Sequence, residues 1–81
     1  MDPVEVVLIK CFQVVFPQVP KERLPFASVD SVSNWDSVAT VNLISLIHEE
    51  FVISIDAEEV EHFSSFAKIL ALVQQKVQPR S

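Results

Sequence analysis

The chain has 81 residues, enough for one domain with a modest core. Hydrophobic residues make up 49% of it, which excludes an intrinsically disordered chain, and the formal net charge of −5 argues against binding to nucleic-acid phosphates. No apolar run has transmembrane length and no signal-peptide pattern opens the chain, so we expect a cytoplasmic protein without membrane insertion.

The first predicted element is a helix over about residues 2–16. Asp2 is a suitable N-cap, Pro3 suits the first helical position, and Glu5 can complete a capping box. Apolar residues then recur over most of the helix circumference, which predicts packing on more than one side. The helix should end before Pro17, because proline disfavours helical geometry in the preceding residue.

Residues 17–36 are predicted to form a long first loop, since they contain three prolines. Loops of this length are uncommon in compact domains unless they carry function. A packed connector with a short helical turn is the simpler alternative. Four apolar residues are candidates for pinning the loop to the helices: Leu24, Phe26, Val29 and Val32.

A second helix is predicted over about residues 37–51, with Asp36 as its N-cap and Trp35 anchoring the loop before it. Its inward positions are expected to be Leu43, Ile44, Ile47 and Phe51. Asp56 and Glu59 form a capping-box pattern that predicts a short helix over 57–62. An apolar stripe at helical spacing predicts a last helix over 65–77; it consists of Phe66, Ile69, Leu70, Val73 and Val77.

The predicted fold is therefore all-α, a single domain over residues 1–81 with three long helices, one short helix and a long first loop. Glycine is absent, which excludes glycine-rich phosphate loops and the G-x-S-x-G nucleophile elbow. Cys11 is the single cysteine and lies among apolar residues, so it is interpreted as a small core residue.

Ser37 is the candidate functional residue, because it opens the predicted second helix directly after Asp36. The first N–H groups of a helix lack intrahelical partners and carry partial positive charge, so they can hold a phosphodiester attached to this hydroxyl. A flexible arm at the end of a rigid helix can swing outward without unfolding it. Taken alone, an Asp-Ser pair more commonly only caps a helix.

With its Asp36-Ser37 pair and its order of helices, the chain resembles the acyl carrier protein family of phosphopantetheine-binding carriers. The resemblance covers most of the chain and is most specific from Trp35 to Phe51. It implies a four-helix bundle of the acyl-carrier type that is not an enzyme. It also implies that a phosphopantetheinyl transferase uses coenzyme A and Mg²⁺ to attach 4′-phosphopantetheine to Ser37, with Asp36 beside the transferred phosphate.

The modified protein would hold acyl groups as thioesters and deliver them to partner enzymes. In related carriers the second helix is the recognition surface, and the resemblance implies that the partner-contacting residues here are Val38, Val41, Glu49 and Glu50. Residues 49–61 contain six acidic residues and no Lys or Arg, which fits basic partners, although a solvated acidic face is the alternative. We expect a monomer.

The sequence departs from the family pattern at several positions. Valine follows Ser37 where leucine or methionine is commoner, and Val52 takes the place of the usual glycine after the second helix. The middle of that helix carries Ala39, Asn42 and Ser45, where fatty-acid carriers tend to be acidic or methionine-rich. These departures favour a specialised lipid or secondary-metabolite pathway with its own loading and transferring enzymes.

Two other function classes remain open at this stage: an aminoacyl or peptidyl carrier, and a helical interaction module without a prosthetic group. A serine hydrolase is disfavoured, because Ser37 and His48 lie roughly 16 Å apart along one predicted helix and cannot share a hydrogen bond there. No metal site is expected, since the acidic residues lack EF-hand spacing and the two histidines form no familiar zinc pattern.

Overall fold

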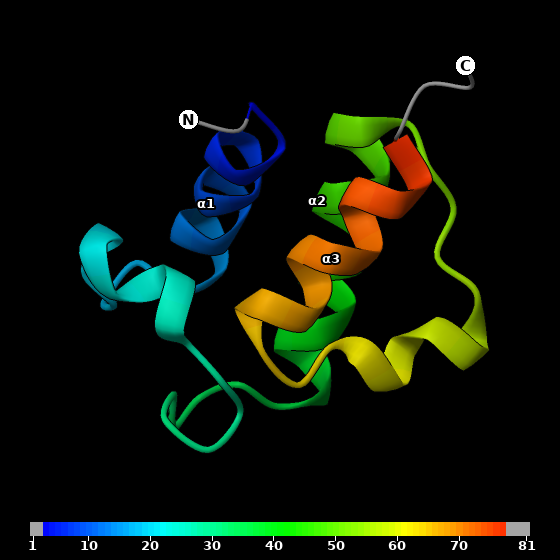
Figure 1. Ribbon diagram of the computed structural model, residues 1–81. Helices are drawn as coiled ribbons and strands as arrows, with labels where there is room; N and C mark the ends of the chain where they lie inside the picture. The colour runs from blue at the N-terminus through cyan, green and yellow to red at the C-terminus, as the bar shows by residue number, and fades with distance from the viewer. Residues whose placement is uncertain (1–2, 78–81) are drawn as a thin grey trace.

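The computed structural model describes residues 3–77, and within this range it contains helices and no β-strand. The expected all-α class is confirmed. In chain order the elements are α1 (Pro3–Val15), η1 (Lys21–Phe26), α2 (Ser37–Phe51), η2 (Ala57–His62) and α3 (Phe66–Val77), where η marks a 3₁₀ helix. The three α-helices pack together, with η1 beside α1 and η2 leading into α3 (Figure 1).

The ranges of α2 and η2 coincide with those expected from the sequence. Helix α1 ends at Val15, although the Phe16 N–H still donates a 2.7 Å hydrogen bond to the Phe12 carbonyl. As its apolar circumference indicated, α1 packs against α2, α3 and η1. The expected cap Asp2 lies outside the described residues.

A cluster of aromatic side chains forms the centre of the core. Phe12 of α1 lies between three rings, with centroid distances of 4.9 Å to Phe66, 5.5 Å to Trp35 and 5.9 Å to Phe16. All four side chains are nearly or fully buried. Phe12 belongs to α1, Trp35 to the end of the first loop and Phe66 to α3, so their packing ties the first loop to both helices. Full burial of one such side chain is worth about 1.5–3 kcal/mol.

The first loop is more ordered than its prolines indicated, because η1 occupies its middle. Leu24 and Val32 are buried as expected, but the expectation for Phe26 is wrong, since 83% of its side chain is exposed. In a 3₁₀ helix, residues three apart share a face. Phe26 therefore lies on the face of Arg23, which is exposed, and away from the buried Leu24.

The end of the first loop is fastened to the beginning of α3. The Phe66 N–H donates to the Ala27 carbonyl at 2.9 Å, and the Val29 N–H donates to the Ser64 carbonyl at 2.9 Å. This short antiparallel contact includes an isolated β-bridge between Ser28 and Ser65. The loop is thereby fixed at a point close in sequence to α2, whose N-terminus carries the candidate site.

Candidate functional site

Ser37 is the first residue of α2, and its side chain is exposed. Its hydroxyl makes no hydrogen bond within residues 3–77. Asp36 has an extended backbone and caps the helix: its Oδ1 accepts a 2.9 Å hydrogen bond from the Ala39 N–H. The Asp36 carbonyl accepts the first helical bond, from the Thr40 N–H at 3.0 Å. The cap therefore holds the backbone at Ser37 while leaving the hydroxyl free.

Two N–H groups of the first turn remain available. Those of Ser37 and Val38 have no hydrogen-bond partner among the described residues, whereas those of Ala39 and Thr40 are used by Asp36. Unpartnered N–H groups at a helix N-terminus favour a negatively charged group nearby. A phosphodiester on the Ser37 oxygen fits this donor set.

Trp35 fixes the approach to the site, as the sequence indicated. Only 6% of its side chain is exposed, and its ring lies 5.4 Å from Phe16 and 5.5 Å from Phe12. Its Nε1–H donates a 3.2 Å hydrogen bond to the Thr40 hydroxyl in the first turn of α2. One buried side chain therefore couples the end of the loop, the helix start and the core.

A mainly apolar open groove of about 480 Å³ adjoins Ser37. From α2 it is lined by Ser37, Thr40, Val41 and Ile44, and across from them by Val60 of η2 and by Phe63, with Val29, Trp35 and Asp36 completing it. Val60 and Phe63 were not among the residues predicted for this site, because their proximity to Ser37 comes from tertiary packing. The only available signal was that Val60 is an apolar residue within an acidic segment and that Phe63 is an apolar residue just after it.

The four residues expected to contact partners are all exposed, but the structure divides them. Val38 and Val41 lie near Ser37, and 68% and 59% of their side chains are exposed. Glu49 lies on the same face of α2 as Val38, because the eleven positions between them correspond to about three full turns of the helix. Glu50 lies about 100° further round, towards α1, where its charge reaches Cys11.

Cys11 is buried in the core. Burial, and then the negative charge of Glu50, raise the pKa of its thiol to about 11. The thiol therefore remains protonated at neutral pH and is a poor nucleophile. This agrees with the sequence interpretation of Cys11 as a core residue.

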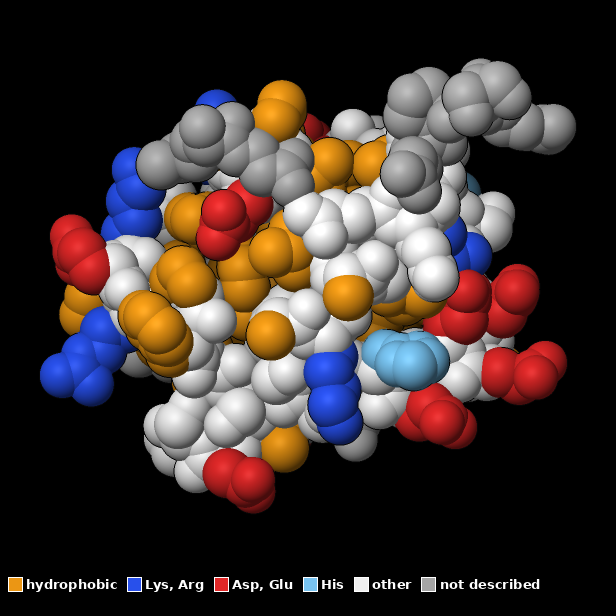
Figure 2. Space-filling view, viewed as in Figure 1, with side chains coloured by type: hydrophobic (Ala, Val, Ile, Leu, Met, Phe, Trp, Pro, Cys, Tyr) orange, Lys and Arg blue, Asp and Glu red, His pale blue; other side chains and the backbone are white. Residues whose placement is uncertain are grey.

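The remaining chemistry-bearing residues do not converge on Ser37. The His48 ring lies at the C-terminal end of α2, where its Nδ1 is 2.6 Å from the Ile53 carbonyl oxygen. Within residues 3–77 no group of three or more His, Cys, Asp or Glu side chains is placed to hold a metal ion. Acidic side chains instead gather over η2, at the right of Figure 2; they belong to Asp56, Glu58, Glu59 and Glu61.

Comparison with known proteins found no matching family model, no matching curated protein and no matching solved structure. None of the helices in the described part of the chain is both long and apolar enough to cross a membrane.

Proposed function

We propose that the protein is an acyl carrier protein of the phosphopantetheine-binding type, with Ser37 as the attachment residue. The observation that carries the proposal is an exposed hydroxyl at the first position of α2, beside two N–H groups that have no partner within the described residues. These groups match the geometry and charge that a phosphodiester needs. The helical architecture is compatible with a four-helix bundle of the acyl-carrier type, with η2 as the short helix.

Ser37 takes part in one covalent step. Its oxygen forms a bond to the pantetheine-side phosphorus of coenzyme A, the phosphoanhydride bond breaks, and adenosine 3′,5′-bisphosphate leaves. The hydroxyl proton would pass to a base of the phosphopantetheinyl transferase, and Mg²⁺ held by the transferase would supply positive charge for the leaving group. Asp36 lies next to the reacting oxygen in sequence and caps the helix, so it keeps the N–H donors in place.

The attached thiol would carry an acyl group as a thioester. Val38 and Val41 form an exposed apolar surface next to Ser37, and Glu49 extends the same face of α2 towards its other end. We assign this face to docking by loading and transferring enzymes. Apolar contacts beside the attachment point fit a partner whose active site must receive the arm, and the acidic charge favours a basic rim on that partner.

Co-expression with a broad-specificity phosphopantetheinyl transferase tests the proposal. Intact-mass measurement should show the gain of one 4′-phosphopantetheine group. Ser37→Ala should abolish the gain, whereas Ser45→Ala, which removes another exposed serine of α2, should retain it. Circular dichroism should show both variants folded. An unmodified wild type, under conditions that modify a control carrier, would contradict the proposal and favour a helical interaction module.

A further inference from the structure

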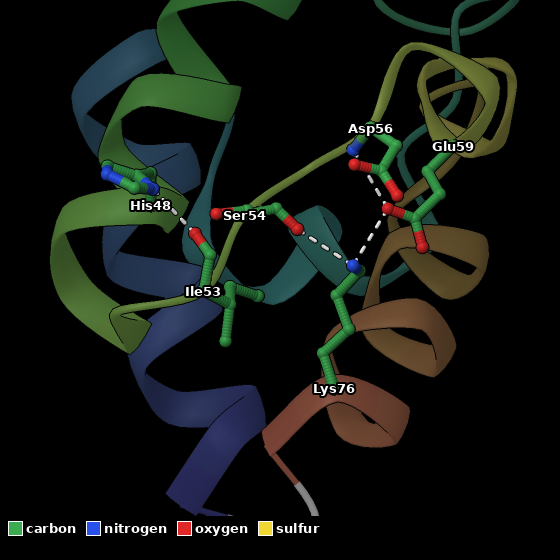
Figure 3. A network of polar contacts seen from close by, with 6 residues as sticks. All are labelled: His48, Ile53, Ser54, Asp56, Glu59 and Lys76. Atoms are coloured by element: carbon green, nitrogen blue, oxygen red, sulfur yellow. Dashed lines mark hydrogen bonds and ion pairs between the residues drawn. The ribbon is translucent and has the colours of Figure 1, made fainter.

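The segment that joins α2 to η2 is held by two side chains. Residues 52–56 form a non-helical linker, and two of its carbonyl groups contact side chains of neighbouring helices. The Ile53 carbonyl oxygen lies 2.6 Å from Nδ1 of His48 on α2, and the Ser54 carbonyl accepts a 2.7 Å hydrogen bond from Nζ of Lys76 on α3 (Figure 3). One residue near the end of α3 therefore fixes a segment more than 20 positions earlier.

Lys76 also binds the short helix itself. Its Nζ lies 2.8 Å from Oε1 of Glu59, and the same oxygen accepts a 2.9 Å hydrogen bond from the Asp56 N–H. The side chains of Lys76 and Glu59 are 22% and 24% exposed, so most of each side chain is covered by the protein. Figure 3 shows the ammonium group between the linker and η2, joined to both. A single side chain thus connects α3, the linker and η2.

Helix η2 is otherwise anchored from its C-terminal side, where the Ser64 carbonyl accepts a hydrogen bond from the Val29 N–H. It contains no buried residue, and it packs against α3. Phe63, which follows it, is the nearest buried side chain, with 4% exposed. Segments with few buried apolar contacts open at low free energy. At the N-terminal side of η2, its position therefore depends on the contacts that Lys76 makes.

The position of η2 matters because Val60 and Phe63 form the wall of the groove that faces Val41 and Ile44. We propose that Lys76 is a positioning residue: by holding η2 against α3, it sets the width of the groove beside Ser37. This inference rests on the proposed function for its biological role, since the groove width would decide how much of a group carried on Ser37 can lie against the protein. The structural part of the inference concerns the unmodified chain.

Hydrogen exchange and methyl NMR of the unmodified full chain test the inference. Lys76→Met keeps the length of the aliphatic side chain and removes its charge and donors. It should speed exchange of the Glu59 and Phe63 amides about tenfold, the scale expected for losing charged hydrogen bonds. The methyl resonances of Val41 and Val60 should shift with it. Lys76→Arg, which keeps the charge and the donors, should restore both signals.

Lys68→Met is the matched control, because Lys68 is an exposed lysine of α3 whose side chain has no ion pair or hydrogen bond within residues 3–77. It should leave exchange in η2 and both methyl signals unchanged. Exchange in Lys76→Met within twofold of wild type, or an equal effect of Lys68→Met, would overturn the inference. If Lys76→Met also exposes the Leu43 amide, unfolding is global and Glu59→Gln decides: faster exchange confined to η2 supports the inference, and unchanged exchange overturns it.

These readouts do not depend on modification of Ser37. A chain that never accepts phosphopantetheine but loosens η2 in Lys76→Met would refute the proposed function and leave the positioning role intact. A chain that accepts phosphopantetheine, but whose amide exchange in η2 does not change in Lys76→Met, would support the proposed function and refute the positioning role.

Discussion

The two ends of α2 are finished in different ways. At the N-terminal end, Asp36 caps the helix through its carboxylate, and the side chain of Trp35, the residue before it, is buried in the core. At the C-terminal end, Val52 has φ 54° and ψ 48°, the left-handed conformation, and 86% of its side chain is exposed. A helix commonly ends on glycine in this conformation, because a side chain with a Cβ is strained there.

The two ends also differ in the kind of contact that holds them. The end that carries Ser37 combines a helix cap, aromatic packing and a hydrogen bond from Trp35 to Thr40. The opposite end leads through a strained residue into a linker held by His48 and Lys76. The arm proposed for Ser37 would need a fixed base, which the N-terminal end would supply.

Trp35→Ala should destabilise the domain by about 3–5 kcal/mol, because it removes a large buried ring and leaves a cavity. If the free energy of unfolding of the wild type lies at the lower end of the usual range of about 5–15 kcal/mol, little of it would then remain. Trp35→Phe keeps most of the ring packing but loses the bond to Thr40, and should cost about 1 kcal/mol. Urea unfolding followed by circular dichroism measures both. A loss below 1 kcal/mol for the alanine variant would show that the N-terminal end is not anchored as described.

Val52→Gly should have the opposite effect and raise the free energy of unfolding by about 1 kcal/mol. It relieves left-handed strain of about 1–3 kcal/mol, partly offset by the greater freedom of glycine in the unfolded chain. Little packing is lost, since the side chain is exposed. The melting temperature should rise by about 4–8 °C. Val41→Gly, at another exposed valine but inside the helix, should lower stability; a loss in Val52→Gly would contradict the assigned strain.

The smallest effect concerns pH. The hydrogen bond from Lys76, and then that from the Asp56 N–H, hold the pKa of Glu59 below its ordinary value of 4.5, with a further contribution from nearby His62. A lowered folded pKa means that the contribution of Glu59 to stability is complete above 4.5 and is lost as the pH falls through the folded value. Amide exchange in η2, corrected for its intrinsic pH dependence, should therefore rise as the solution is acidified below 4.5.

Glu59→Gln is the control for this titration. It should show the faster exchange already at neutral pH and lose the acid dependence. A carboxyl-carbon NMR titration of Glu59 with its midpoint at or above 4.5 would contradict the described network.

Local signals in the sequence were sufficient for much of the fold. The pair Asp36-Ser37 marks the beginning of α2, the Asp56–Glu59 pattern marks η2, and helical periodicity marks the remaining helices, because capping and amphipathicity depend on residues a few positions apart. Half of the capping box at η2 is seen directly in the bond from the Asp56 N–H to Glu59.

Long-range features could not be predicted in the same way. The contact of Lys76 with Glu59 joins residues 17 positions apart, and the groove beside Ser37 needs η2 to return to α2. Neither has a local pattern. The solvent-facing position of Phe26 depends on the three-residue period of η1. The sequence did not predict this helix, because its residues include Pro25. The sequence shows that valine replaces the usual glycine at position 52, but only the structure shows that Val52 has the left-handed conformation.

The central claim is that Ser37 carries a thiol-bearing arm. Fragment mass spectrometry of the chain after co-expression with a phosphopantetheinyl transferase measures this most directly, since it locates the added group on a residue. We expect one added group, on Ser37, and a single thiol that reacts under native conditions at neutral pH, because Cys11 is buried and protonated. An added group on another residue, or no added group while a control carrier is modified, would contradict it.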